Sequence, residues 1–340
     1  MRIGIVNDLA MAREALRRAV LSAPGHQVVW MAGDGAEAIE KTRAELPDLI
    51  LMDLVMPGVD GVEATRRIMA ETPCPILVVT ATVSGHLGRV FDAMGHGALD
   101  TVETPTLGPH GEVTGATPLL EKIAMIGRLI GRAAGSSSSV DIPTIPSVWN
   151  GPLVLIGSST GGPNALASIL ADYPAQQDAC TIIVQHVDAA FAPGLANWLG
   201  ERTGRRVDLV TPGERPSSGR ILLAATNDHL TMDSFQRLHY TAEPVSLSYR
   251  PSVDVFFSCV ATRWSGPGVA AVLTGMGRDG AKGLLKLRQA KWFTIAQDQA
   301  TSIVWGMPRA AAEVGAAVEV LPIERIGKAI VAHLQRSPTA

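Results

Sequence analysis

The sequence is poor in cysteine, and it lacks long apolar runs. Its three cysteines, Cys74, Cys180 and Cys259, are odd in number and far apart, so they fit neither a disulfide framework nor a metal-binding pattern and favour a reducing compartment. No apolar run reaches the length that spans a bilayer, and the first residues enter a strand pattern without the apolar region of a signal peptide. We therefore expect a cytoplasmic protein with no direct membrane insertion.

An excess of charge of either sign is also missing. The 29 Lys and Arg residues nearly balance the 32 Asp and Glu residues, and the formal net charge is −3. A nucleic-acid-binding protein would show a basic patch or stripe, so we expect no nucleic-acid partner. The length and the apolar content of the chain are those of a globular protein. Its 340 residues, of which 46% are hydrophobic, suffice for two buried cores.

Residues 1 to about 130 alternate short apolar runs with helical patterns. The runs are 3–6, 28–31, 49–52, 76–79 and 98–102, and the helical stretches lie near 11–21, 36–44, 61–70, 85–94 and 119–130. Five β/α units of this length predict a doubly wound parallel α/β sheet. Ligands of such sheets bind beyond the carboxyl ends of the strands.

Acidic and hydroxyl side chains stand where these predicted strands end. Asp8 follows the first strand, Asp53 the third and Thr80 the fourth. Two acids with a further oxygen donor at one sheet edge suit Mg²⁺, and a carboxylate beside that ion can accept a phosphoryl group. Each acid alone also fits a structural role, Asp8 as a helix cap and Asp53 as the start of a turn. Their matching positions favour a site.

The motifs of this half resemble those of a response-regulator receiver domain. They are N-D after the first strand, L-M-D-L-V-M-P-G-V-D-G around the end of the third and V-V-T-A at the end of the fourth. The resemblance implies a flavodoxin-like fold over residues 1–125, in which Asp53 is the phospho-acceptor and Thr80 contacts a phosphoryl oxygen. It also implies a Mg²⁺ ion, needed for phosphorylation, held by Asp8, Asp53 and the Val55 carbonyl.

Three positions depart from the receiver pattern. Asn7 stands where receivers usually carry a further acid, Thr101 where they often carry an aromatic residue, and Thr104 where they carry the lysine of a Lys-Pro pair. That lysine normally contributes a cation to the phosphoryl group, and a threonine hydroxyl cannot replace its charge. We expect phosphorylation with a weaker or different coupling to the rest of the chain.

A stretch rich in Gly, Ser and Pro follows the first half. Residues 131–150 read G-R-A-A-G-S-S-S-S-V-D-I-P-T-I-P-S-V-W-N. The Gly/Ser part predicts a flexible chain and the Pro-containing part an extended one. We place a linker over 126–150 and a second domain over 151–337.

The second domain opens on a glycine-rich turn between an apolar run, 153–156, and a helical run, 163–171. Gly157, Ser159 and Gly161 match the G-x-S-x-G nucleophile elbow, in which a serine stands between a strand and a helix N-terminus with free N–H groups. A phosphate-binding loop is the alternative, but the lysine of a Walker loop and the spacing of a dinucleotide loop are absent.

Two further polar residues follow predicted strands of this half. His186 comes just after the run 181–184, and Asp279 lies in the loop after the run 269–273. A serine, a histidine and an aspartate at one sheet edge would supply a nucleophile, a base and an acid that orients the base. The alternatives to this pair are His229 as the base and Asp228, Asp254 or Asp298 as the acid, each of which could instead cap a helix or be structural.

The motifs of the second half resemble the catalytic domain of chemotaxis protein-glutamate methylesterases, the CheB family. They are L-I-G-S-S-T-G-G-P, I-V-Q-H-V, S-Y-R-P-S-V-D-V-F-F and L-T-G-M-G-R-D-G-A-K-G. The resemblance implies a three-layer α/β/α domain with Ser159, His186 and Asp279 as catalytic triad and backbone oxyanion donors at Thr160 and Met276. Ser158 stands where the family usually has alanine, a difference that we expect to be tolerated. The M-R-I-G-I-V-N-D opening and the E-T-P segment resemble the Wsp-type branch, which serves surface-sensing arrays.

This resemblance implies a phosphorylation-regulated serine esterase. It would hydrolyse glutamate γ-methyl esters on the cytoplasmic helices of a methyl-accepting chemoreceptor, releasing methanol, and some members also deamidate receptor glutamines. Its partners would be that receptor and a CheA-type histidine kinase, and the hydrolysis itself would need no cofactor. Two alternatives stay open: a serine hydrolase acting on another ester class, and a non-catalytic signalling scaffold in a chemosensory array.

Overall fold

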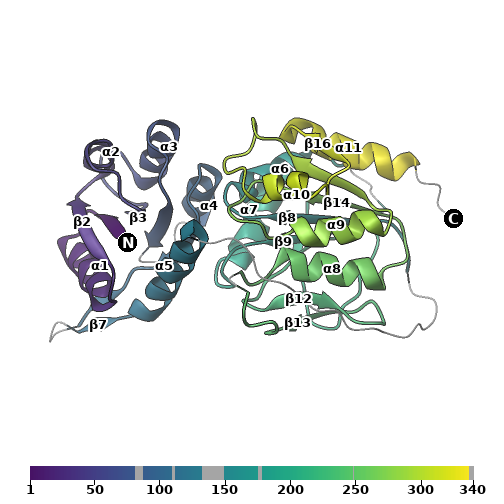
Figure 1. Cartoon of the computed structure of the whole chain (residues 1–340), viewed down its shortest axis with the longest axis horizontal. Coiled ribbons are helices and arrows are strands. Elements are labelled where there is room, and N and C mark those ends of the chain that lie inside the picture. The colour runs from purple at the N-terminus through teal and green to yellow at the C-terminus, as the bar shows by residue number, and fades with distance from the viewer. Residues whose placement is uncertain (81–86, 109–111, 132–148, 175–177, 248, 337–340) are drawn as a thin grey trace. The chain divides into compact units, whose positions relative to one another are not determined.

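The chain forms two compact units, Met1–Ala134 and Gly135–Ala340 (Figure 1). The structure is a computed structural model and describes residues 1–80, 87–108, 112–131, 149–174, 178–247 and 249–336. Each unit is built on its own parallel sheet.

The first unit has a five-stranded sheet of order β2-β1-β3-β4-β5, in which all neighbouring strands are parallel. This is the flavodoxin-like order, and it confirms the predicted doubly wound fold. The strands are β1 (Arg2–Val6), β2 (Gln27–Ala32), β3 (Leu49–Asp53), β4 (Ile76–Thr80) and β5 (Asp100–Glu103). The helices are α1 (Ala10–Ser22), α2 (Gly35–Ala44), α3 (Gly61–Glu71), α4 (Leu87–Gly95) and α5 (Ala116–Gly131).

Local sequence accounts for most of these elements. The central strands β3 and β4 are buried along their whole length, as expected for apolar runs covered by helices on both faces. Asp34 and Asp60 cap α2 and α3 by accepting hydrogen bonds from the N–H groups of Glu37 and Glu63. A short hairpin, β6 (Thr106–Leu107) with β7 (Val113–Thr114), was not predicted because two-residue strands show no alternation.

The predicted linker differs from the structure at its start. Helix α5 continues to Gly131, so residues 126–131 of the predicted linker 126–150 are helical. Its apolar 3.6-residue pattern persists to that point, which explains the helix. Residues 132–148 lie outside the described part of the chain.

The second unit has a seven-stranded parallel sheet of order β10-β11-β9-β8-β14-β15-β16. Its strands are β8 (Leu153–Ser158), β9 (Cys180–Gln185), β10 (Val207–Leu209), β11 (Ile221–Leu223), β14 (Gly268–Val272), β15 (Phe293–Gln297) and β16 (Glu319–Leu321). The helices are α6 (Gly162–Ala171), α7 (Ala192–Thr203), α8 (Val253–Arg263), α9 (Ala281–Gln289), α10 (Met307–Glu313) and α11 (Ile323–Arg336).

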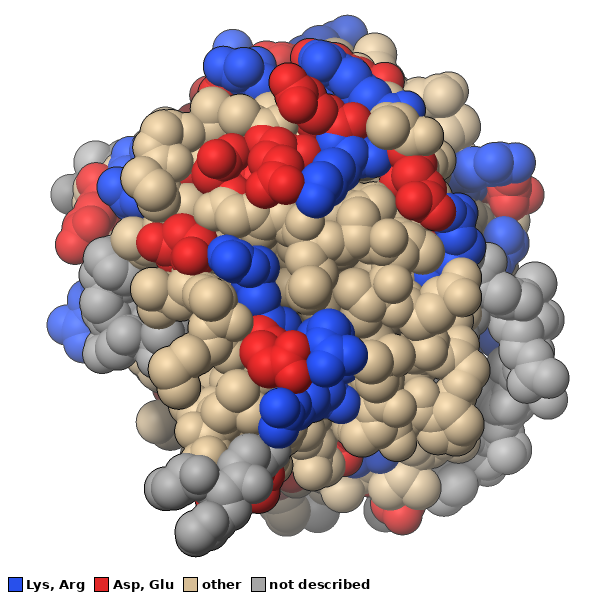
Figure 2. All heavy atoms as spheres, turned by 90° about the vertical axis from the view of Figure 1, so that its left-hand side faces the viewer, with Lys and Arg blue, Asp and Glu red and all other residues tan. Residues whose placement is uncertain are grey.

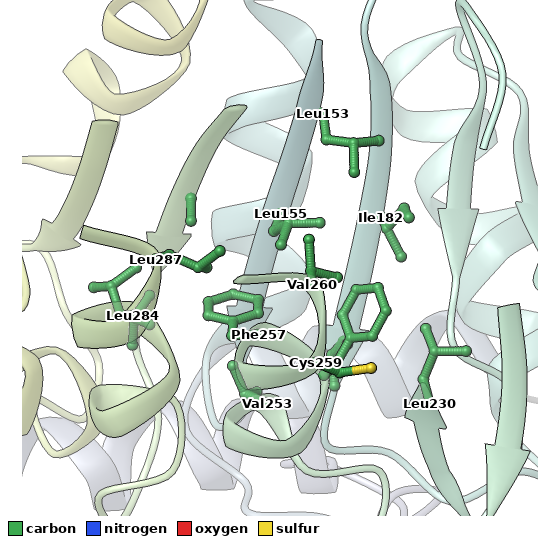
Figure 3. Packing of buried hydrophobic residues seen from close by; sticks show 14 of the residues in the cluster. Leu153, Leu155, Ile182, Leu230, Val253, Phe257, Cys259, Val260, Leu284 and Leu287 are labelled. Atoms are coloured by element: carbon green, nitrogen blue, oxygen red, sulfur yellow. The ribbon is translucent and has the colours of Figure 1, made fainter. Parts of the chain in front are cut away.

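Helices cover both faces of this sheet, which gives the predicted three-layer arrangement. Helices α8, α9 and α10 pack together, and α6 packs against α7 and α11. Figure 3 shows Val253, Phe257 and Val260 of α8 among the side chains of β8 and β9. Leu153 and Leu155 of β8 belong to this cluster, while the equally buried alternate residues of the strand face the other helix layer.

An antiparallel hairpin, β12 (His229–Met232) with β13 (Leu238–Thr241), packs against α8. Tyr240 of this hairpin donates a hydrogen bond to the Val210 carbonyl and accepts one from the Ala225 N–H. These bonds join the hairpin to the segments that follow β10 and β11, while β12 packs against α8, whose first turn reaches the polar edge of the sheet.

Charged groups of both signs are interspersed on the face shown in Figure 2, with wide uncharged areas between them. On the helices of the first unit, Glu14 pairs with two arginines and Glu63 with two others, at spacings of three and four residues. These pairs lower the pKa of Glu14 and of Glu63 to about 2. Among the described helices, none is long and apolar enough to cross a membrane.

Candidate active site

Three neighbouring strands at the centre of the second sheet carry the residues predicted for catalysis. Ser159 directly follows β8, His186 directly follows β9, and Asp279 lies in the loop after β14. The Ser159 N–H donates to the Thr274 carbonyl at 3.0 Å, and the His186 N–H donates to the Ser158 carbonyl at 3.0 Å. Because β9, β8 and β14 are adjacent and parallel, their ends meet at one edge of the sheet.

His186 and Asp279 form a buried pair. The distance from His186 Nε2 to Asp279 Oδ2 is 2.8 Å, and the two side chains are only 8% and 9% exposed. The other ring nitrogen of His186, Nδ1, is buried and has no hydrogen-bond partner within the described chain. One nitrogen is thus held by a carboxylate while the other is available to a reacting group.

The first turn of helix α8 holds the Asp279 carboxylate. Its oxygens accept hydrogen bonds from the N–H groups of Val253 at 2.7 Å and Asp254 at 3.0 Å, and from the Ser252 hydroxyl at 2.8 Å. Burial alone would raise the pKa of Asp279, but the hydrogen bond and charge of His186, together with these donors, bring it below its ordinary value. Asp279 is therefore an anion at neutral pH, stabilised by a helix N-terminus.

A second carboxyl group, Asp254, lies behind this pair. Its Oδ1 accepts a hydrogen bond from the Gly283 N–H at 2.6 Å. Burial, and then the nearby negative charge of Asp279, raise the pKa of Asp254 to about 7. Of these two acids, Asp279 is the one bonded to His186, so Asp254 does not take the place of the orienting acid.

His229, the alternative base, has another position in the fold. It is fully buried, its Nδ1 accepts a hydrogen bond from the Ser252 N–H at 3.1 Å, and its Nε2 lies 3.3 Å from the Pro244 carbonyl oxygen. Burial lowers the pKa of His229. Since both of its ring nitrogens have partners, His229 supports the N-cap of α8 and does not offer a free base.

The turn that carries Ser159 is tight, but its unusual backbone angle falls on a glycine. Gly161 has a φ of 78° and sits where a Cβ would lie 2.8 Å from Ile303, so only glycine fits well there. Ser159 is 4% exposed. Within the described residues no hydrogen bond joins Ser159 Oγ to His186, and such bonds often shorten only when substrate binds.

Gln185 ties the serine turn to the histidine strand. Its Nε2 donates to the carbonyl oxygens of Ser159 at 2.9 Å and His186 at 3.1 Å, and its Oε1 accepts from the Ser158 hydroxyl at 2.6 Å. Ser158 and Gln185 are both fully buried. The sequence predicts only that Ser158 is tolerated, and it does not single out Gln185. Only its place at the end of an apolar strand could have indicated it.

Two backbone N–H groups, those of Thr160 and Met276, are the predicted oxyanion donors. In the described chain neither the Thr160 N–H nor the Met276 N–H donates a hydrogen bond, whereas the Thr160 carbonyl accepts one from the Thr274 hydroxyl at 2.8 Å. At Gly275, beside Met276, a Cβ would lie 2.7 Å from the Ser159 Cβ. Free donors close to the serine are what an oxyanion requires.

The first unit gathers its own polar residues at the ends of the adjacent strands β1 and β3. Asn7 Nδ2 donates to Asp53 Oδ2 at 2.9 Å, and the Leu54 N–H donates to Asp53 Oδ1 at 2.7 Å. Asp53 is 9% exposed, and Thr80 at the end of β4 is 2% exposed. Asn7 thus uses its amide to hold Asp53, in the place where receivers usually carry an acid.

The oxygen ligands at this edge of the sheet fit a hard divalent cation such as Mg²⁺. Asp8 is exposed and does not cap α1, whose N-cap is Leu9 without a side-chain hydrogen bond. Its carboxylate, that of Asp53 and the Val55 carbonyl are all oxygen ligands. The described residues contain no cluster of three or more His, Cys, Asp or Glu that could hold a metal.

The two threonines that depart from the receiver pattern lie around β5. The hydroxyls of Thr101 and Thr104 are buried without a hydrogen-bond partner in the described structure, and the Thr104 N–H donates to the Thr80 carbonyl at 2.9 Å. Lys122 does not replace the missing lysine, because it pairs at 2.6 Å with Asp100, at the opposite end of β5.

Comparison with protein families gives two matches. Residues 154–330 match the CheB methylesterase family, and residues 3–107 match the response regulator receiver domain.

Curated proteins and a solved structure agree with these matches. A protein-glutamate methylesterase/protein-glutamine glutaminase of the group 3 operon of Pseudomonas putida is 55% identical, over 96% of this chain and 97% of its own length. A protein of Mesorhizobium japonicum named protein-glutamate methylesterase/protein-glutamine glutaminase is 50% identical over 99% of this chain and 100% of its own. The crystal structure of the Thermotoga maritima CheB methylesterase catalytic domain is 32% identical with a TM-score of 0.51, covering 54% of this chain and 98% of that one. With its polar residues at the ends of β8, β9 and β14 and its similarity over nearly the full length, the chain belongs to the CheB methylesterase family and carries a response regulator receiver domain before the methylesterase domain.

Proposed function

We propose that this chain is a phosphorylation-regulated protein-glutamate methylesterase and protein-glutamine glutaminase acting on chemoreceptors. The observation that carries the proposal is the buried His186–Asp279 pair, with a free His186 Nδ1, at the strand end next to Ser159. A serine esterase needs a nucleophile, a base and a fixed acid in this arrangement.

The proposed reaction is acyl transfer through Ser159. Ser159 Oγ attacks the carbonyl carbon of the glutamate ester while His186 Nδ1 takes its proton, and Asp279 stabilises the imidazolium that forms. The N–H groups of Thr160 and Met276 hold the developing oxyanion. His186 then gives the proton to the departing methanol, and a water molecule repeats the sequence to release the glutamate carboxylate. A glutamine amide fits the same geometry, with ammonia in place of methanol.

The receiver domain supplies the regulation in this proposal. A CheA-type histidine kinase provides the phosphoryl group for Asp53, and Thr80 contacts a phosphoryl oxygen. Asp8, Asp53 and the Val55 carbonyl would hold Mg²⁺, which would neutralise phosphoryl charge. The substrate side chains lie on the cytoplasmic helices of a receptor, so the enzyme acts in the cytoplasm. A surface-sensing output of the Wsp type stays a prediction.

The test is release of labelled methanol from receptor membranes whose glutamates carry labelled methyl esters. The purified chain should release methanol, and Ser159→Ala should lower kcat by as much as ~10⁶-fold because the triad acts as one unit. Release by Ser159→Ala at the wild-type rate would contradict the assignment. A small-molecule ester hydrolysed in preference to the receptor would favour the alternative ester class, and an inactive wild type would favour the scaffold.

A further inference from the structure

Tyr249 lies flat against the imidazole of His186. The two ring centroids are 4.1 Å apart and the planes differ by 9°, which is a stacked pair. Tyr249 belongs to the loop that precedes helix α8. Neither the proposed acyl transfer nor the hydrogen bonds around Asp279 use this side chain.

The hydroxyl of Tyr249 reaches the loop after β14. It donates a hydrogen bond to the Met276 carbonyl at 3.2 Å. Burial, and then the charge of Asp279, raise the pKa of the Tyr249 phenol, so it stays a protonated donor. The neighbouring Gly277 has a φ of 87°, and a Cβ there would lie 2.9 Å from the Tyr249 hydroxyl oxygen. The glycine thus leaves room for this contact.

We propose that Tyr249 is a positioning residue that joins the base to the oxyanion loop. This inference rests on the proposed function. The Tyr249 ring fixes the plane of His186. It also stabilises the imidazolium, because the face of an aromatic ring attracts a cation within about 6 Å of its centroid. Its hydroxyl fixes the loop around Met276, the residue whose N–H is the proposed oxyanion donor.

Other charged and titratable groups lie around this contact. Asp279 bonds its Nε2, and Asp254 and His229 lie behind Asp279 at the first turn of α8. Arg250 and Arg278 are chain neighbours of Tyr249 and Asp279. All of these groups are unchanged in the variants below, so a difference between variants reports on Tyr249.

The experiment compares Tyr249→Leu and Tyr249→Phe in the full chain, by methanol release from methyl-labelled receptor membranes without a phosphodonor. Tyr249→Leu removes the stacked ring, so kcat should fall roughly 10-fold. The base must be neutral to take a proton, so kcat/KM rises with pH. Without the stacked ring the imidazolium is less stable relative to the neutral imidazole, so the rising limb of the kcat/KM profile should move to lower pH.

Tyr249→Phe keeps the ring and loses the hydroxyl. It should leave the rising limb in place and lower kcat by a few-fold with little change in KM, because the oxyanion contact forms in the transition state. Tyr240→Phe is the matched control, since Tyr240 also has a partly buried, hydrogen-bonded hydroxyl in this unit but supports the hairpin. It should keep the wild-type rate.

An active wild type together with unchanged rates and pH profiles in both Tyr249 variants would overturn the inference. An inactive wild type would instead overturn the proposed function. If Tyr249→Leu does not fold, as judged by circular dichroism, Tyr249→Met takes its place. A Tyr249→Phe variant with the pH limb displaced as far as in the leucine or methionine variant would also contradict the role given to the ring.

Discussion

Two carboxyl groups, Asp279 and Asp254, lie at the start of helix α8, and their pKa values are shifted in opposite directions. Asp279 accepts three hydrogen bonds at the start of α8 and lies against His186, so its pKa is lowered. Burial and then the nearby charge of Asp279 raise the pKa of Asp254 to about 7, although the hydrogen bond from the Gly283 N–H acts in the opposite direction. The fold has thus favoured the anion on the acid that holds the base.

Asp254→Asn should stabilise the protein more at high pH than at low pH. An acid whose pKa is raised in the folded state does not lower the free energy of unfolding at pH values below its ordinary pKa. The free energy of unfolding falls as the pH rises from that value through the folded-state pKa of about 7. Asparagine stays neutral and keeps an oxygen for Gly283. We expect a gain on the order of 2 kcal/mol in the free energy of unfolding at about pH 8, and little gain at about pH 4.

Urea unfolding of the wild type and of Asp254→Asn at the two pH values measures this. The opposite trend is expected for groups such as Asp279, whose lowered pKa gives stability that is lost only as pH falls below its ordinary value. An equal effect of Asp254→Asn at both pH values would show that Asp254 is ionised in the same way in the folded and unfolded chains.

The identity of the polar residues could be predicted from sequence, but their contacts could not. Ser159, His186 and Asp279 were identified because each follows a predicted strand within a dense motif. The choice of Asp279 over Asp254 as the acid, and of His186 over His229 as the base, depends on which side chain points to which atom. Likewise the bond between Ser158 and Gln185 joins two buried residues 27 positions apart, and no local pattern indicates such a pair.

At the scale of elements, the first turn of α8 connects the hairpin to the site. His229 of β12 accepts a hydrogen bond from the Ser252 N–H, and the Ser252 hydroxyl both accepts from the Val255 N–H at 3.3 Å and donates to Asp279. Ser252 is therefore both the N-cap of α8 and a hydrogen-bond donor that holds Asp279.

Ser252→Ala should lower both stability and activity. Loss of an N-cap costs about 1 kcal/mol of unfolding free energy, and a less firmly held Asp279 should reduce kcat, by less than the loss of Ser159 or His186 does. Asp34→Ala, which removes the cap of α2, is the matched control: it should cost similar stability and leave the unphosphorylated esterase rate unchanged. Thermal unfolding and methanol release measure the two effects. Equal rates in the two variants would mean that Ser252 acts as a cap alone.

Long buried strands were predictable because their apolar runs are continuous, and the helices because their apolar residues recur at helical spacing. The three-residue strands β10 and β16 and the strands of the small hairpins were missed or only partly indicated. Strand order is also absent from local sequence: β14 follows β8 by more than a hundred residues, yet it lies beside it. Pairing of this kind is set by the packing of the whole sheet.

At the scale of the whole molecule, the departure at Thr104 bears on how strongly phosphorylation is transmitted. Thr104 has a buried hydroxyl without a hydrogen-bond partner in the described structure. A lysine there would place a cation against the phosphoryl oxygens. A ligand shifts a two-state equilibrium only by its differential interaction with the two states. Phosphorylation should therefore raise the esterase rate of the wild type only modestly.

Thr104→Lys should therefore raise the ratio of phosphorylated to unphosphorylated esterase rates, without changing the rate of the unphosphorylated chain. A charged contact of this kind contributes about 1.5–3 kcal/mol where it is desolvated. The ratio is measured by receptor demethylation with and without a small-molecule phosphodonor, at matched phosphorylation of the two proteins. An unchanged or smaller ratio in Thr104→Lys would mean that another feature limits the switch.

In the proposed function, one chain joins a phospho-accepting Asp53 to a serine esterase centred on Ser159. Methanol release from methyl-labelled receptor membranes by the full chain, with a phosphodonor and Mg²⁺ present or absent, tests this claim most directly. We predict that the phosphodonor increases release by the wild type, leaves Asp53→Asn at its basal rate and fails to restore Ser159→Ala. An increase of the same size in Asp53→Asn, or wild-type release by Ser159→Ala, would contradict the account.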